Sequence, residues 1–329
     1  MVSKQKRKSG YTFWLVMGLL AFLLSTPQGM VTKILTSNGL DAFSFMAIRN
    51  GVILVCVLPV ALVGTIRHWC AIKRHWRPML VGGMCLGASS VAYTVAIETG
   101  MASHVSIINL LTPIVLVVLS AKIVHDKVSH RATVGITLAA VGGVLAVAVP
   151  MLLTGAVESF INPVSVFLAL FNCIVYPIAM VYMRRANGEG VPLSLMLALS
   201  SVLVVLMSLV LEPTMRGTTI LDALPGLSVF DWILVVIYSG IIVALLVRLV
   251  IVRSYEVVGA TVLGGFEYLH TLLAIILPII ILNEKLSPEI FAGAILILLG
   301  IYLTESHHHM HPHTHILHAP IHKKAKSRR

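Results

Sequence analysis

The sequence predicts an all-α integral membrane protein whose ten transmembrane helices form two inverted five-helix repeats. Three observations carry this prediction: a low charge content, ten apolar segments of spanning length, and a sequence repeat offset by 158 residues. Of the 329 residues, 58% are hydrophobic and 11% are charged, whereas soluble domains carry about 25% charged residues. No soluble core could hide this much apolar surface, so lipid must be the solvent for most of the chain.

Ten segments meet the requirement of about 20 mostly apolar residues for a spanning helix. They run near 11–32, 43–66, 79–97, 104–124, 132–152, 162–183, 193–211, 230–251, 259–282 and 289–304. No connection between them is long or polar enough to form a soluble domain. The chain therefore divides into a basic N-terminus (1–10), a first five-helix repeat (11–152), a second, inverted repeat (153–304) and a His-rich basic tail (305–329).

The distribution of basic residues predicts the orientation, because cytoplasmic loops are enriched in Lys and Arg. With a cytoplasmic N-terminus, 20 of the 24 Lys and Arg residues fall in cytoplasmic segments, Arg248 among them. Those left to the outer half are Lys33, Arg49, Arg216 and Lys285. We therefore expect a multi-pass protein of the cytoplasmic membrane with both termini in the cytoplasm. The basic start resembles a signal peptide, but no clear cleavage site follows, which favours a retained first helix.

The net charge of +11 points to lipid as the partner. Basic side chains near an anionic leaflet gain about 1 kcal/mol each, so nucleic acid is not needed to explain the charge. The segment from Arg67 to Arg77 contains Trp69 and Trp76 among basic residues, a pattern that predicts a position at the membrane interface. The expected partners are the lipid bilayer and a small-molecule substrate; a homodimer is left open.

A shift of 158 residues superposes two parts of the chain without a gap. Identical pairs include Glu98 and Glu256, Ala102 and Ala260, Lys127 and Lys285, Ser129 and Ser287, Gly135 and Gly293, Leu138 and Leu296, and Gly142 and Gly300. Because each copy has five predicted helices, an odd number, the second copy enters the membrane upside down. Inverted repeats are a transporter architecture, since they give one chain two similar shapes that open to opposite sides.

These features resemble the EamA-like permeases of the drug/metabolite transporter superfamily, from about residue 11 to residue 304. The residues that carry the resemblance are Lys33, Arg49, Tyr93-x-x-Ala96-Ile97, Pro113, Asp126-Lys127-Val128-Ser129, Gly135 and Gly142, followed in the second copy by Glu284-Lys285-Leu286, Gly293 and Gly300. The chain departs from the family pattern at Thr271, which stands opposite Pro113, and at Asp126, where the family usually has Glu. The resemblance implies a secondary active transporter that exports metabolites, amino acids or related small compounds by alternating access.

Polar residues inside the spans mark a candidate path for substrate or protons, because a charge at the bilayer centre costs at least about 2.5–3.5 kcal/mol. Glu267 and His270 lie three residues apart on one face of the ninth predicted helix, near the midplane. The 158-residue shift pairs them with Asn109 and Thr112 in the fourth. We predict that Glu267, tuned by His270, binds substrate or a coupling proton; the alternative is a buried carboxylate that serves packing.

Further candidates for the path are Arg49, Tyr93, Asn172, Tyr176 and Tyr268. Two interpretations of Arg49 are open: it attracts carboxylate-bearing substrates, or it braces helix ends through backbone carbonyls. Small residues at helical spacing predict a packing seam, because they let helices approach closely in lipid. They are Gly83, Gly87, Gly135, Gly142, Gly293 and Gly300.

The tail is dense in imidazoles, which bind transition metals. Its candidate metal ligands are His307, His308, His309, His311, His313 and His315. The alternative is a polar tail whose composition carries no function.

Other function classes are less well supported. No span contains a His-Glu metal motif or a Gly-x-Ser-x-Gly elbow, and no glycine-rich phosphate loop follows a strand. We therefore expect neither an enzyme nor a cofactor. The alternatives to metabolite export are a carrier for another cargo, such as nucleotide sugars or metal-linked substrates, and a non-transporting scaffold or channel.

Overall fold

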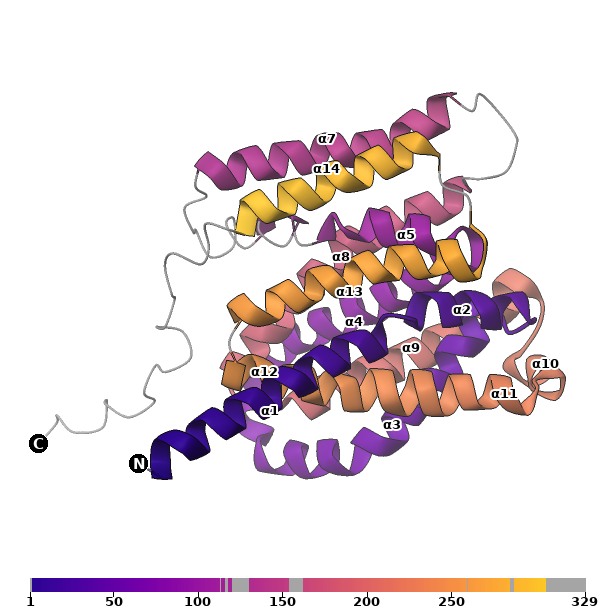
Figure 1. Cartoon of the computed structure of the whole chain (residues 1–329). Coiled ribbons are helices and arrows are strands. Elements are labelled where there is room, and N and C mark those ends of the chain that lie inside the picture. Colours follow the sequence, from indigo (N-terminus) through magenta and orange to yellow (C-terminus); the bar gives the residue numbers. More distant parts are fainter. Residues whose placement is uncertain are drawn as a thin grey trace, which may run out of the picture.

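The computed structural model is all-helical over the residues that it describes, which are 2–112, 114–115, 118–119, 130–153, 162–258, 260–284 and 287–305. The helices form a bundle in which most run along a common direction (Figure 1). The first half of the chain contains α1 (Val2–Ser25), α2 (Gln28–Ser37), α3 (Ala42–Arg67), α4 (Trp69–Thr99), α5 (Ala102–Asn109) and α7 (His130–Leu153). The second half contains α8 (Pro163–Gly188), α9 (Leu193–Arg216), α10 (Ile220–Ala223), the 3₁₀ turn η1 (Leu224–Gly226), α11 (Val229–Trp232), the π-helical segment η2 (Ile233–Val247), α12 (Arg248–Val258), α13 (Ala260–Ile281) and α14 (Pro288–Glu305).

Within the described residues, six helical segments are long and apolar enough to cross a membrane. They are Tyr11–Ser37, Ala42–Arg67, Trp69–Thr99, Pro163–Asn187, Leu193–Arg216 and Val229–Ile251. Shorter apolar helices cover Thr133–Ala146, Leu269–Ile281 and Pro288–Leu303. The all-helical membrane class predicted from the sequence is therefore confirmed, whereas the count of ten spans stays a prediction.

The first predicted span, 11–32, is two helices rather than one. Thr26 and Pro27 separate α1 from α2, because proline has no N–H to continue the helical hydrogen bonds. The hydroxyls of Ser25 and Thr26 turn back onto the carbonyl oxygen of Phe22, at 2.8 and 3.0 Å. The break leaves backbone groups of this span accessible to side chains from other helices.

The third span begins earlier than its hydropathy predicts, at Trp69 instead of residue 79. His75, with φ −117° and ψ 27°, separates a short first part of α4 from the rest. In that part Ile72 is buried, while Trp69 and Trp76 are 60% and 49% exposed. This amphipathic pattern suits a membrane interface, where indoles sit at headgroup depth.

The seventh span continues past its predicted end at residue 211. Helix α9 runs on to Arg216 and ends at Gly217, whose φ of +70° is in the left-handed region that glycine adopts readily. The predicted span ends early because Glu212 lowers the local hydropathy. In the structure the carboxyl group of Glu212 is buried and accepts a 2.7 Å hydrogen bond from the Ser44 hydroxyl.

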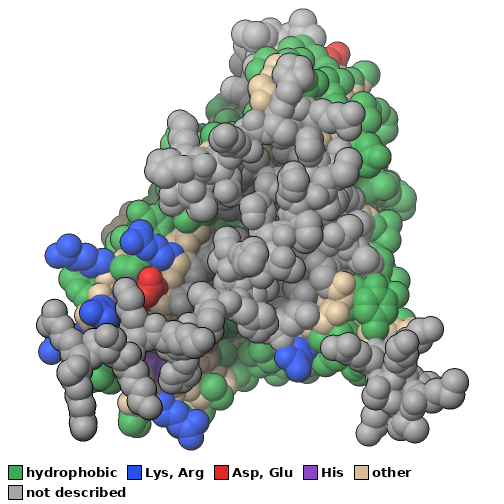
Figure 2. Space-filling view, turned by 90° about the vertical axis from the view of Figure 1, so that its left-hand side faces the viewer, with side chains coloured by type: hydrophobic (Ala, Val, Ile, Leu, Met, Phe, Trp, Pro, Cys, Tyr) green, Lys and Arg blue, Asp and Glu red, His purple; other side chains and the backbone are tan. Residues whose placement is uncertain are grey.

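Basic side chains gather at one end of the bundle. Figure 2 looks onto the end where α1 begins and shows Lys and Arg side chains grouped there. Exposed basic residues at the end of α3, in the first part of α4, near the end of α8 and within α12 are Arg67, Lys73, Arg74, Arg77, Arg185 and Arg253. His75 joins this connection to the end of α8 through a 3.6 Å contact between its Nε2 and the carboxylate of Glu189.

The most extensive helix contacts join the two halves of the chain. They pair α7 with α14, α4 with α8, α3 with α9, and α1 with α12. The helix bounds also follow the 158-residue shift. It carries α7 onto a range that starts at 288, where α14 begins, and α4 onto 227–257, which α11, η2 and α12 cover.

Helices α7 and α14 pack closely along the seam that glycines predicted. They lie side by side at the top of Figure 1. A Cβ atom at Gly142 would lie 2.7 Å from the carbonyl oxygen of Gly293, and one at Gly300 would lie 2.5 Å from that of Gly135. The earlier glycine of α7, Gly135, faces the later one of α14, Gly300, and Gly142 faces Gly293. The two helices are therefore antiparallel. In α4, Gly83 and Gly87 face α9 instead.

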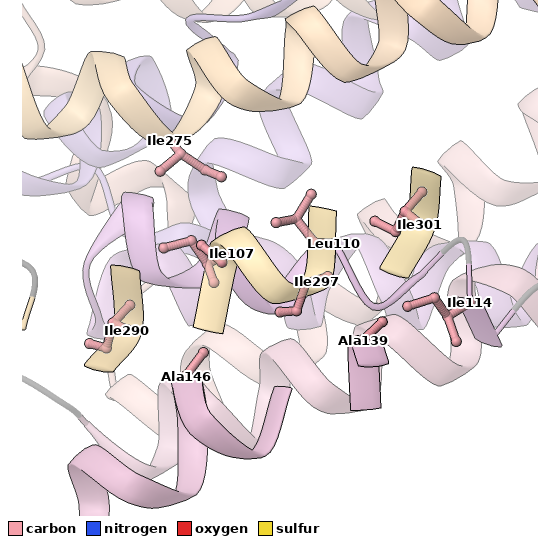
Figure 3. Packing of buried hydrophobic residues seen from close by; sticks show 10 residues of the cluster. Ile107, Leu110, Ile114, Ala139, Ala146, Ile275, Ile290, Ile297 and Ile301 are labelled. Carbon is pink, nitrogen blue, oxygen red and sulfur yellow. The ribbon is translucent and has the colours of Figure 1, made fainter. Parts of the chain in front are cut away.

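An apolar cluster covers this seam (Figure 3). It joins α5, α7, α13 and α14 through Ile107, Leu110, Ile114, Ala139, Ala146, Ile275, Ile290, Ala294, Ile297 and Ile301. Because α5 and α13 reach the cluster from opposite halves of the chain, it fixes the positions of the two helices that carry the predicted central residues.

Candidate functional site

The break between α1 and α2 is a meeting point for three other helices. The Tyr238 hydroxyl, on η2, donates a 2.8 Å hydrogen bond to the carbonyl oxygen of Leu24. From α4, the Tyr93 hydroxyl lies 3.4 Å from where a Cβ at Gly29 would stand. From α13, the His270 ring packs against Phe22 with a centroid distance of 6.0 Å. Helix breaks inside membranes are tolerated where they line a site, and transporters bind substrates at such breaks.

Arg49 of α3 lies beside this break. It interacts electrostatically with Tyr93, Tyr238 and Arg248. Its Nε atom is buried and makes no hydrogen bond. Helix η2 reaches α3 closely here, since a Cβ at Gly240 would lie 3.0 Å from the Val52 side chain. Two guanidinium groups, from α3 and α12, thus share one region with two tyrosines.

A second polar group joins α5 to α8. Asn172 Nδ2 donates a 2.8 Å hydrogen bond to Asn109 Oδ1, and the Cys173 thiol donates to the Ile108 carbonyl at 3.2 Å. Tyr93 also contacts Ser106, which lies one turn before Asn109 on α5. Tyr93 therefore connects the helix break to the asparagine pair.

The structure brings together only part of the site predicted from the sequence. Arg49, Tyr93 and His270 lie around the break, Asn109 and Asn172 form the pair, and Thr112 contacts Cys173. Tyr176 packs against an apolar cluster that contains Leu86 and Met196. The side chains of Glu267 and Tyr268 and the whole His-rich tail (His307 to His315) lie outside the described residues.

A pocket of about 400 Å³ opens at the end of the bundle opposite the basic one. Its lining is Lys33, Ser37, Thr99, Gly100, Met101, Asn162, Leu282 and Glu284. Lys33 and Glu284 hold the turn between α4 and α5 from two sides, and we call this pair the α4–α5 clamp. The sequence placed both residues in family motifs without indicating this role.

The α4–α5 clamp complements the charges of two helix ends. Lys33 Nζ donates to the carbonyl oxygens of Ile97, Glu98 and Gly100, at 3.1, 2.9 and 2.6 Å. Those carbonyls end α4, where a cation is favoured. The Glu284 carboxylate accepts from the backbone N–H groups of Ala102 and Ser103 at 2.8 and 2.9 Å, and also from the Ser103 hydroxyl. Those groups begin α5, where an anion is favoured.

The asparagine pair should contribute measurably to stability. We expect Asn109→Ala and Asn172→Ala to be coupled by about 0.5–1.5 kcal/mol in a double-mutant cycle, as for one buried hydrogen bond. Thermal unfolding of the purified protein in detergent measures the four midpoints. Among the described residues, Asn50 bonds within its own helix, to Met46, so Asn50→Ala combined with Asn172→Ala should be additive. Equal additivity for both pairs would mean that the asparagine bond contributes nothing.

Comparison with known proteins gives one family. The model of the EamA-like transporter family matches residues 12–148 and, a second time, residues 163–306. A solved structure described as "Crystal structure of protein" is 17% identical, with a TM-score of 0.56, over 91% of this chain and 98% of that chain. That similarity shows the fold alone. No curated protein matches the chain significantly.

Proposed function

The chain belongs to the EamA-like transporter family, and from this premise we propose that it exports small metabolites, amino acids or related compounds. Its family makes it a membrane transporter of the drug/metabolite superfamily. The proposed mechanism is secondary active transport across the cytoplasmic membrane by alternating access. The observation that supports it best is the break between α1 and α2, where side chains from three other helices and Arg49 converge.

We propose that the two family matches are inverted repeats with five spans each. Three observations support this: helix bounds that follow the 158-residue shift, helix pairs that join the two halves, and antiparallel packing of α7 and α14. Inverted repeats are related by a pseudo-twofold axis in the membrane plane. The basic end of the bundle then faces the cytoplasm, and the pocket between Lys33 and Glu284 faces outward.

Counterflow in proteoliposomes tests the proposed function. Purified protein is reconstituted, loaded with one unlabelled metabolite or amino acid at a time, and supplied with the same labelled compound outside, with and without a pH gradient. A transporter gives transient accumulation that saturates with substrate. Flux that does not saturate and ignores the counter-gradient would identify a channel, and no flux for any compound would support a scaffold.

Glu267→Gln tests the predicted proton or substrate role of that carboxyl group. Because an ionisable group inside a span is costly, we expect this one to be required. Exchange should fall at least about tenfold, the loss expected for one charge-assisted hydrogen bond, and its response to the pH gradient should disappear. The matched control is Glu189→Gln at an exposed position after α8. If Glu267→Gln transports as the parent protein does, with the same pH response, the carboxyl group serves packing only.

A further inference from the structure

Arg49 carries a positive charge that no described residue neutralises. Among those residues, the ion pairs are Glu98 with Arg216 and Glu189 with His75, so none involves Arg49. A second guanidinium, that of Arg248, is its strongest charged neighbour and has the same sign. Charges inside a membrane are retained where they serve function, and a buried charge without a partner is destabilising.

A bracing role does not explain Arg49. A cation that braces helix ends binds backbone carbonyls, as Lys33 does with three of them. Arg49 makes no hydrogen bond to a carbonyl within the described residues, and its buried Nε is without a partner. The sequence left two roles open for Arg49: bracing helix ends and attracting carboxylate-bearing substrates. Lys33 makes the bracing contacts, so attraction of an acidic substrate is the role that is left for Arg49.

The surroundings of the two arginines suit a bound anion. The helix break lies beside Arg49, and Tyr238 anchors one side of it through Leu24. Tyr93 and Tyr238 interact electrostatically with Arg49. A guanidinium group presents its N–H donors in a planar fork that matches carboxylate and phosphate oxygens. An anion bound by Arg49 would satisfy its free Nε donor and offset the repulsion from Arg248.

We propose that Arg49 and Arg248 bind the acid group of the transported substrate, which is therefore a small organic anion. This inference rests on the proposed transport function and adds the chemical class of the cargo. Carboxylates and phosphate esters share the required oxygens, so the experiment includes both.

The test uses acids paired with neutral partners of similar shape: nicotinate with nicotinamide, and glycerol 3-phosphate with glycerol. Binding is measured as a shift in the thermal midpoint of the purified full-length protein in detergent, titrated with each compound. Transport is measured by counterflow of the same compounds. We expect at least one acid to bind and exchange at least tenfold better than its neutral partner.

Variants then assign this preference to Arg49. Arg49→Gln should weaken binding of the acid about 10- to 100-fold, as for the loss of one or two hydrogen bonds to a charged group. Arg49→Lys keeps the charge without the fork and should lose part of the affinity. The control is Arg185→Gln, which removes an exposed charge at the basic end and should leave acid binding unchanged.

Several outcomes overturn the inference. One is a panel in which no acid binds better than its neutral partner; another is an acid preference that survives in Arg49→Gln. A lower thermal midpoint in Arg49→Gln with unchanged acid affinity would assign Arg49 to structure. Saturable counterflow of neutral compounds alone would refute the anion class and leave the transport function standing. An acid that binds through Arg49 without any counterflow would refute transport instead.

Discussion

Gly142→Leu should remove most of the folded protein, since the new side chain has no room in the seam between α7 and α14. The Cβ alone would lie 2.7 Å from the carbonyl oxygen of Gly293 and 2.8 Å from the backbone nitrogen of Ile297. Overpacking costs typically about 1–3 kcal/mol when side chains can move aside. Here backbone atoms block the space, so the loss should reach or exceed the upper end of that range.

Size-exclusion chromatography and thermal unfolding of the detergent-solubilised protein measure the effect. The matched control is Ala140→Leu, two positions earlier on an exposed face of the same helix, which should keep the parent elution volume and midpoint. A monodisperse Gly142→Leu protein with the parent midpoint would show that the two helices do not pack as closely as the seam requires.

Glu284→Ala should also lower stability strongly, because one carboxylate supports the start of α5 through three hydrogen bonds. Its loss leaves the N–H groups of Ala102 and Ser103 without their acceptor. Hydrogen bonds to a charged group contribute about 1.5–3 kcal/mol, and we expect a loss of that order in the free energy of unfolding. Glu284→Gln keeps one acceptor oxygen and should lose less.

Thermal midpoints of the three proteins test this. We expect the parent protein to have the highest midpoint, Glu284→Gln a lower one and Glu284→Ala the lowest. Glu189→Ala, at an exposed position on the opposite end of the bundle, controls for the loss of a negative charge. Should Glu284→Ala melt with the parent, water replaces the carboxylate in the pocket and the α4–α5 clamp adds no stability.

The fold class could be predicted because apolar length is a strong signal. Every described long helix overlaps a predicted segment, and Gly142 and Gly293, which the spacing singled out, lie close to another helix. Helix ends were predicted less well. Hydropathy measures composition, so it does not reveal the helix break at Pro27. It also ends the seventh segment before Glu212, whose carboxyl group is buried in contact with Ser44.

The candidate site was predictable in residue types and less so in partners. Intramembrane polarity drew attention to Arg49, Tyr93, Asn109 and Asn172, since such groups are rare in spans. Contacts between helices far apart in sequence carry no local pattern, however. The electrostatic interaction of Arg49 with Arg248, which lies within a turn of the end of the apolar segment Val229–Ile251, is one example.

The way the halves pair bears on how the chain is made. A ribosome delivers α1 to α7 first, yet the main partners of α1, α3, α4 and α7 are α12, α9, α8 and α14. Lipid must therefore contact the glycine and polar faces of the early helices until the later helices are inserted. Assembly then resembles the docking of two subunits that share one peptide chain, and the tether supplies the local concentration that separate subunits would lack.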